Sequence, residues 1–209
     1  MKELIAQIEK LKLSMIKSLV DKRILEFKRL GKKPNKEIFK ELCFCLLTAN
    51  FNAERAIVIQ TRIDNEFLRL SEKKLAKRLK ELGYRFPNTR ARYIVAAREY
   101  MRNIKQKLDV FDDEECKARE WLVREVLGLG YKEASHFLRN IGYRNLAIID
   151  FHIVDLLVKS KLLKKPKVLN KKTYLHVEKL LKKLGKELNL NLAELDLYLW
   201  YLETGKVLK

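Results

Sequence analysis

The 209-residue sequence has only three cysteines, Cys43, Cys45 and Cys116. Three thiols cannot all pair within one chain, and no C-x-x-C motif is present, so neither a disulfide framework nor a zinc module is expected. Cys43 and Cys45 lie in the apolar run ELCFCLLTA, where thiols pack as small hydrophobic side chains. The scarcity of cysteine favours a reducing, cytoplasmic setting.

Long hydrophobic runs are also lacking, as is a balance of acidic charge. No stretch is long and apolar enough to cross a membrane, and no signal peptide with a cleavage site is present. Lys and Arg total 46 against 27 Asp and Glu, which gives a net charge of +19. This excess indicates a polyanionic partner, most often nucleic acid, bound partly through release of counterions. An acidic membrane surface is the weaker alternative, because the basic residues are spread over many predicted helices.

Signals for β-strands are almost absent, and NLAII is the nearest candidate. Apolar residues recur at spacings of three and four along most of the chain, which predicts about ten helices and an all-α fold. The lysine-rich first helix and the last two are expected to form one layer around a central block. The predicted helices cover 2–30, 35–48, a segment after Asn52, 71–83, 89–106, 113–127, 131–140, a segment from Asp150, 171–188 and 191–203.

The stretch LGLGYKEA, residues 127–134, carries the first chemical signal. Gly128 and Gly130 leave bare backbone between two predicted helices, and such a turn can hold a phosphate at the N-terminus of the second helix. A plain helix–helix turn, with the glycines as steric relief, remains the alternative.

Lys132 occupies the first turn of that second helix, where the helix dipole disfavours a cation. Nearby positive charge lowers the pKa of a lysine, and a neutral amine is a nucleophile. The alternative is a surface lysine that extends to solvent or contacts a phosphate.

Asp150 follows the apolar run LAII and precedes the amphipathic segment FHIVDLL. It can serve simply as a helix N-cap. Its carboxylate could also face a cation that forms in front of Lys132. For His152, packing and hydrogen bonding are the expected roles.

These residues carry a family resemblance. LGLGYKEA, followed eighteen residues after its lysine by the aspartate of IIDFH, resembles the helix–hairpin–helix and Gly/Pro…Asp motif of the DNA glycosylase superfamily, with Leu127 in place of the usual hairpin proline. LCFCLLTANFNAERA and LGYRFPNTRARYI are similar to other segments of that superfamily. The ending DLYLWYLETGKVLK resembles the second, archaeal-type family of 8-oxoguanine DNA glycosylases. Superfamily branches with an iron–sulfur centre need four clustered cysteines, which this sequence lacks.

The resemblance implies two helical subdomains, residues 1–33 with 147–209 and residues 34–146, with a DNA-binding cleft between them. The helix–hairpin–helix would cover about 115–141. Lys132 would attack C1′ of the damaged nucleotide and form a Schiff base that leads to strand cleavage, while Asp150 would stabilise positive charge on the sugar. Gly128 and Gly130 would grip the phosphate backbone.

The resemblance also implies residues that recognise the damaged base and its surroundings. Trp200 would stack on the extruded base, and the terminal carboxylate of Lys209 would accept a hydrogen bond from the N7–H of 8-oxoguanine. Asn50 would fill the vacated stack, and Arg85 with Phe86 would probe the opposite strand.

The expected protein is therefore a monomeric bifunctional 8-oxoguanine DNA glycosylase/AP lyase that acts on double-stranded DNA without a metal, an iron–sulfur cluster or any other cofactor. A glycosylase of the same fold for another oxidised base, such as an oxidised pyrimidine, is the first alternative. A non-catalytic helix–hairpin–helix module that only binds DNA is the second.

Overall fold

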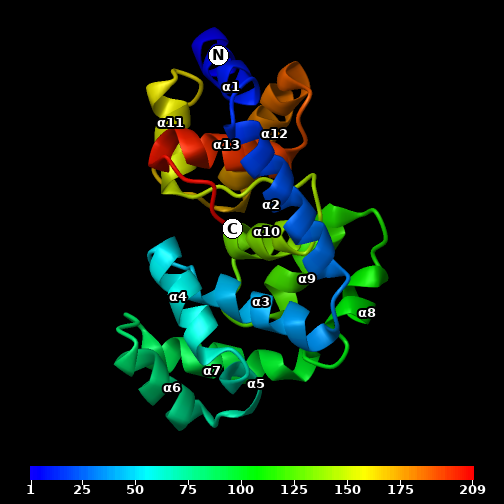
Figure 1. The fold of residues 1–209 in the computed structure, drawn as a ribbon, viewed down its shortest axis with the longest axis vertical. Coiled ribbons are helices and arrows are strands. Elements are labelled where there is room, and N and C mark those ends of the chain that lie inside the picture. Colours follow the sequence, from blue (N-terminus) through cyan, green and yellow to red (C-terminus); the bar gives the residue numbers. More distant parts are fainter. The chain divides into compact units, whose positions relative to one another are not determined.

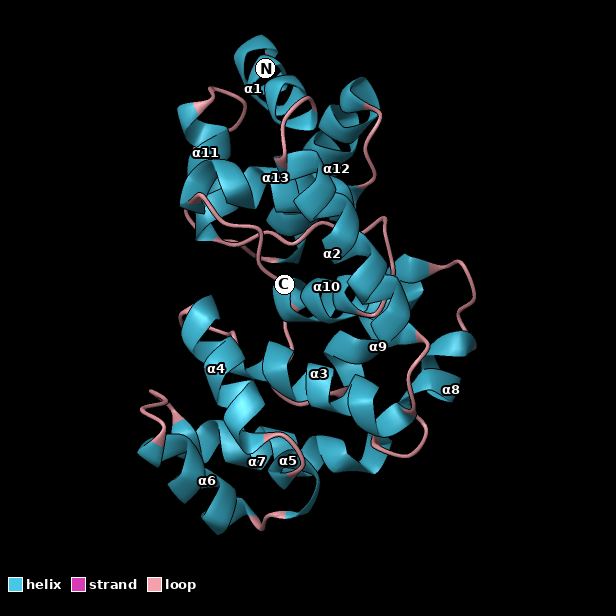
Figure 2. Ribbon diagram, in the orientation of Figure 1, coloured by secondary structure: helices cyan, strands magenta, loops and turns pink.

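Helices and connecting loops make up the whole of residues 1–209 in the computed structural model, and no strand is present (Figure 2). Thirteen α-helices and one 3-10 helix follow one another, which confirms the all-α class. None of the helices is both long and apolar enough to span a bilayer. The elements are α1 (Lys2–Lys12), α2 (Ile16–Gly31), α3 (Asn35–Leu47), α4 (Ala53–Ile63), α5 (Glu66–Arg69), α6 (Glu72–Glu81), α7 (Pro87–Ala97), η1 (Arg98–Tyr100), α8 (Ile104–Asp109), α9 (Glu115–Glu125), α10 (Tyr131–Asn140), α11 (Phe151–Lys159), α12 (Lys171–Leu188) and α13 (Leu192–Thr204).

The chain divides into two compact units. The terminal unit comprises Met1–Arg29 and Leu138–Lys209, and the central unit comprises Leu30–Phe137. The boundary falls inside α10, whereas the sequence-based division at residue 146 would place all of α10 in the central subdomain.

In the terminal unit, α13 is the helix about which the others pack (Figure 1). It contacts α1, α11 and α12, and its residues are apolar on nearly every face. A helix that is hydrophobic all round belongs in a core, because no face gains from solvation. Seven consecutive or near-consecutive residues of α13 are accordingly buried: Leu192, Ala193, Leu195, Asp196, Leu197, Tyr198 and Leu199.

In the central unit, α3 takes the corresponding place. All ten residues from Ile38 to Leu47 are buried, and α3 contacts α4, α5, α7 and α8. Cys43 and Cys45 are fully buried within it, as expected for small hydrophobic residues. Burial raises the pKa of Cys43 well above its ordinary value, so this thiol is inert as a nucleophile.

The predicted helix 2–30 is wrong in one respect, since it is interrupted at residues 13–15. The Ser14 hydroxyl donates to the Leu11 carbonyl (2.8 Å) and accepts from the Ile16 amide (3.2 Å), which gives the backbone a local alternative to helix hydrogen bonds. Lys12 Nζ donates to the Leu188 carbonyl (2.7 Å) and so ties the end of α1 to the end of α12.

The predicted helix 89–106 is also divided, into α7, η1 and α8. The side chain of Asn35 donates to the Arg102 carbonyl (2.6 Å) and accepts from the Lys105 amide (3.0 Å). A residue about seventy positions away thus ends one helical run and starts the next. The sequence pattern around residue 100 carries no sign of it.

Candidate active site

The turn between α9 and α10 depends on glycine at position 128. Gly128 has a φ of +87°, and a Cβ there would lie 2.1 Å from Cδ2 of the Tyr93 ring in α7. No side chain fits that space, so the ring of Tyr93 packs directly against the hairpin backbone. Val126 and Leu129 are buried on the inner side of the turn, while Leu127 is exposed.

Side chains of α9 and the first turns of α10 hold the two helices together. The Tyr131 hydroxyl donates to Glu120, and the guanidinium of Arg119 lies 5.1 Å from the centroid of the Tyr131 ring. Arg119 is almost fully buried and also donates to Ser135 Oγ (3.3 Å). These contacts fix the start of α10, the helix that carries Lys132.

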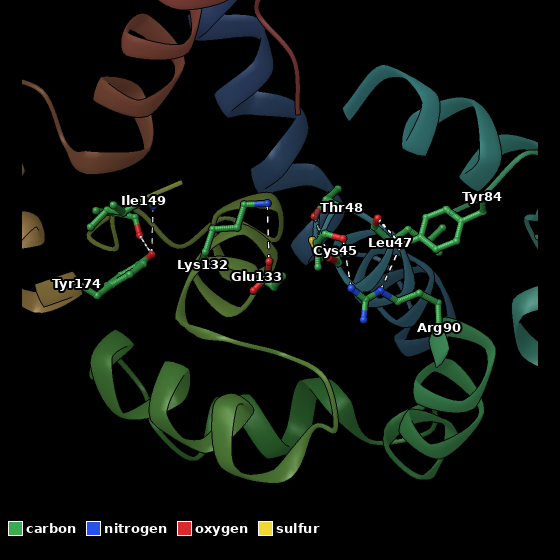
Figure 3. Close-up of polar contacts among 11 residues, drawn as sticks. Cys45, Leu47, Thr48, Tyr84, Arg90, Lys132, Glu133, Ile149 and Tyr174 are labelled. Carbon is green, nitrogen blue, oxygen red and sulfur yellow. Dashed lines mark hydrogen bonds and ion pairs between the residues drawn. The ribbon is translucent and has the colours of Figure 1, made fainter. Parts of the chain in front are cut away.

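Lys132 lies in the first turn of α10, as predicted, with 21% of its side chain exposed. Its Nζ lies 3.9 Å from Oε1 of Glu133, whose side chain is only 14% exposed (Figure 3). Oε2 of Glu133 lies 3.1 Å from the position that a Cβ on Gly130 would take, so this carboxylate folds back toward the start of the helix. The sequence indicates only the positive end of the helix near Lys132, and the structure adds the negative charge of Glu133 beside the amine.

Two loops of the central unit, one carrying Asn50 and one carrying Arg85 and Phe86, are tied together. The Tyr84 hydroxyl donates to the Leu47 carbonyl (2.8 Å) and accepts from Arg90 Nε (3.2 Å), and a second Arg90 nitrogen donates to the Ala49 carbonyl (3.2 Å; Figure 3). Tyr84 and Arg90 are both buried. Burial raises the pKa of the Tyr84 hydroxyl, and Arg90 opposes only part of that rise, so Tyr84 remains a donor.

A second link between these loops comes from Arg55 at the start of α4. Its guanidinium donates to the Gly83 carbonyl (2.9 Å) and lies 5.2 Å from the centroid of the Phe51 ring, which itself packs on Tyr84 with centroids 4.5 Å apart. The exposed Asn50 has a φ of +54°, a conformation that asparagine tolerates better than most residues. Neither Tyr84, Arg90 nor Arg55 was singled out from the sequence, because only the folded loops show what they hold.

In the terminal unit, Asp150 is the N-cap of α11. Its Oδ1 accepts from the Ile153 amide (3.0 Å), and the structure gives Oδ2 no hydrogen-bond partner. The carboxylate is partly exposed. One oxygen therefore holds the start of the helix while the other remains available to a cation.

The buried segment 146–149, which leads to Asp150, is held by α12. Ala147 N–H donates to Glu178 Oε2 (3.0 Å), Ile149 N–H donates to the Tyr174 hydroxyl (3.2 Å), and that hydroxyl donates to the Ala147 carbonyl (2.7 Å). A short extended segment without strand partners needs such side chains, because its buried amides would otherwise lose their hydrogen bonds. Tyr174 and Glu178 position Asp150, and sequence periodicity assigned them only to a helix.

Trp200, near the end of α13, lies in an aromatic cluster with two residues of the first turn of α11. The His152 ring meets Trp200 edge-on, with centroids 5.4 Å apart, and packs on Phe151 at 4.2 Å. Phe151 is 64% exposed. Nε1 of Trp200 is buried and has no hydrogen-bond partner. Lys209 is partly buried in the segment that follows the left-handed Gly205.

The predicted site residues thus fall into two sets. The central unit contains Lys132, Gly128, Gly130, Asn50, Arg85 and Phe86, and the terminal unit contains Asp150, Trp200 and Lys209. Within the terminal unit, α11 packs on α13, which brings the Asp150 and Trp200 segments to the same face. No group of three or more His, Cys, Asp or Glu side chains is arranged to hold a metal ion.

Comparisons with known proteins bear on the whole chain. The sequence model described as 8-oxoguanine DNA glycosylase matches residues 20–190. An 8-oxoguanine DNA glycosylase/AP lyase from Methanocaldococcus jannaschii is 54% identical over 207 residues, which cover 99% of each chain. One from Korarchaeum cryptofilum is 49% identical, over 99% of this chain and 98% of that protein.

Solved structures agree with the sequence comparison. A crystal structure of the Methanocaldococcus jannaschii glycosylase/lyase in complex with a 15mer DNA containing 8-oxoguanine matches with a TM-score of 0.96 and 53% identity, over 99% of this chain and 100% of that one. The 8-oxoguanine DNA glycosylase of Thermotoga maritima matches with a TM-score of 0.92 and 42% identity, over 100% and 99%. This protein is therefore a member of the 8-oxoguanine DNA glycosylase family.

Proposed function

We propose that this protein excises 8-oxoguanine from double-stranded DNA and then cleaves the strand at the resulting abasic site. Full-length relatives at 42–54% identity carry both activities in their names, and a matching structure contains DNA with 8-oxoguanine. The observation on this chain that carries the proposal is the amine of Lys132 in the first turn of α10, next to the two glycines of the hairpin.

In the proposed reaction, the damaged nucleotide leaves the stack and its sugar becomes accessible to the protein. After giving up a proton, Nζ of Lys132 forms a bond to C1′ as the bond from C1′ to the base breaks, and the base leaves with the electron pair. Ring opening of the sugar gives a Schiff base between Nζ and C1′. Loss of a proton from C2′ then expels the 3′ phosphate by β-elimination, and water releases the enzyme.

Asp150 has a separate role in this scheme. Positive charge develops on the sugar as the base departs, and a fixed carboxylate oxygen stabilises that charge. The free Oδ2 of Asp150 supports this assignment, because Oδ1 already holds the start of α11. We also propose that Trp200 stacks on the extruded base and that Lys209 contacts it. Asn50, Arg85 and Phe86 are proposed to contact the DNA around the vacated position.

Borohydride trapping tests the nucleophile. A duplex with 8-oxoguanine should form a covalent adduct with the wild-type protein and none with Lys132→Gln, because the amide cannot form a reducible imine. The exposed Lys183 provides a matched control, and Lys183→Gln should trap as wild type does. An undiminished adduct in Lys132→Gln would exclude Lys132. Loss of the adduct in both Lys132→Gln and Lys183→Gln would show that the loss is not specific to Lys132.

Asp150→Asn tests the carboxylate without removing the cap, because an asparagine oxygen can still accept from Ile153. We expect the single-turnover excision rate to fall by about 10²- to 10³-fold, the range found when one stabilising group is removed. An unchanged melting temperature would show that the loss is chemical. A rate within threefold of wild type would contradict the assignment. EDTA should leave excision unchanged, since the proposed chemistry draws on side chains alone.

A further inference from the structure

The helical hairpin formed by α6 and α7 bears a basic hollow on its surface. The hollow has a volume of about 530 Å³ and lies in the central unit. Five of its six lining residues come from α6 and one comes from the first turn of α7: Glu72, Lys73, Ala76, Lys77, Lys80 and Asn88.

The basic hollow has a net positive charge. Lys73, Lys77 and Lys80 are spaced by four and three residues, so they lie on one face of α6. All three are exposed, and none forms an ion pair. On another face of the same helix, Arg78 pairs with Glu66 (3.2 Å) and Glu81 (3.5 Å). The hollow thus keeps three ammonium groups against a single carboxylate.

These groups fit the oxygens of phosphodiesters. Each ammonium offers three donors and no acceptor, and the Asn88 amide adds further donors. Ala76 and the aliphatic parts of the lysines form a floor on which a backbone could lie. Lys80 follows Lys73 by seven positions, so the row extends for about 10 Å along α6, while phosphates of one strand rise by about 3.4 Å along duplex DNA. The row is long enough to meet more than one phosphate.

The position of the basic hollow indicates which strand it meets. α6 ends at Glu81, and the loop that follows it carries Arg85 and Phe86. Asn88 belongs to both the hollow and the start of α7. The hollow therefore continues directly from the loop that is proposed to contact the strand opposite the lesion. We propose that the basic hollow binds the phosphate backbone of the undamaged strand, beyond the lesion. This inference rests on the proposed function, since it takes duplex DNA as the polyanion.

The test compares two triple variants that remove the same charge. K73Q/K77Q/K80Q neutralises the hollow. K179Q/K183Q/K186Q is the matched control, because these three lysines of α12 are also exposed, unpaired and spaced by four and three. The affinity of each full-length variant for an undamaged duplex is measured as a function of salt concentration. Thermal unfolding checks that each variant is folded.

Log affinity falls with log salt, and each lost phosphate contact makes this slope less steep by about 0.9. We expect the hollow variant to lose about two to three such contacts and to bind roughly 10- to 100-fold more weakly at low salt. The slope of the control variant should change by less than about 0.9, the contribution of one phosphate contact. Equal changes in both variants would overturn the proposal, because net charge alone would then account for them. No change in the hollow variant would overturn it as well.

A second measurement locates the contact and separates this inference from the proposed function. Trimming the duplex on one side of 8-oxoguanine should make the slope of log affinity against log salt less steep for the wild type. The slope for K73Q/K77Q/K80Q should not change. If trimming either side affects both proteins equally, the proposed position is wrong. Excision of 8-oxoguanine is assayed in parallel at saturating protein. A wild type that fails to excise, with the slopes as expected, refutes the function and leaves the DNA contact standing.

Discussion

Gly128 shows how strictly a single position constrains the hairpin. Its φ of +87° suits glycine, and the Tyr93 ring occupies the place of any Cβ. Two separate costs would therefore follow from a side chain at this position. One is the backbone strain of a left-handed conformation, and the other is displacement of a packed ring.

We expect Gly128→Ala to lower the free energy of unfolding by about 2–5 kcal/mol, the sum of left-handed strain and overpacking. Gly205→Ala separates the two costs, because Gly205 also has a positive φ (+71°) but no atom lies within 4 Å of its would-be Cβ. That control should lose only about 1–2 kcal/mol. Urea unfolding measures both values. Equal losses would show that Tyr93 moves aside without cost.

At the scale of helices, the sequence predicts a helix boundary well where a local signal sets it. The predicted segments 131–140 and 171–188 match α10 and α12 residue for residue, because Gly130 and the capping residue Asn170 mark their starts. The breaks near residues 14 and 100 escaped prediction. At residue 100 the cause is Asn35, a distant residue, and at residue 14 it is a serine whose side chain replaces helix hydrogen bonds.

In the candidate site, too, local signals could be read from the sequence and contacts between distant residues could not. Lys132 and Asp150 could be proposed from the sequence, because each stands at the predicted start of a helix and in a short motif. The residues that hold the surrounding segments could not be found from the sequence. Tyr174 holds the segment before Asp150 and Tyr84 holds the loop that carries Asn50, and their partners lie 27 and 37 positions away in sequence. A periodic pattern reports which face of a helix is buried, but not which carbonyl a buried hydroxyl meets.

Helices α10 and α13 are joined by a buried ion pair between Arg139 and Asp196, whose side chains are 4% and 10% exposed. Asp196→Ala should lower the free energy of unfolding by about 3–5 kcal/mol, since it removes the carboxylate that pairs with the buried Arg139 guanidinium. Asp21→Ala is the control, because the Lys17–Asp21 pair is about half exposed on both sides. Removing that pair should change stability by no more than about 0.5 kcal/mol. Chemical denaturation would contradict this account if both variants lost the same amount.

At the scale of the whole molecule, the net charge of +19 acts on both stability and binding. Like charges spread over the chain repel one another in the folded state, and a bound polyanion removes that repulsion. DNA of any sequence should therefore stabilise the folded protein in a manner that depends on salt.

An undamaged duplex at about 100 times its dissociation constant should stabilise the protein by about 2.7 kcal/mol. For a chain of this length, that corresponds to a rise of about 5–10 °C in melting temperature. Differential scanning fluorimetry at low salt measures the rise. In 1 M NaCl the shift should vanish, because the Debye length falls to about 3 Å. A shift that persists there would contradict an electrostatic origin.

The cap formed by Asp150 has a consequence for what evolution can place at this position. One oxygen of the carboxylate accepts a hydrogen bond from a backbone amide, and the other faces open space. A glutamate carries the same charge on a longer arm, so it could keep the amide or reach that space, but its two oxygens could not occupy both places. Charge alone is thus not the requirement here: the arm must also be short.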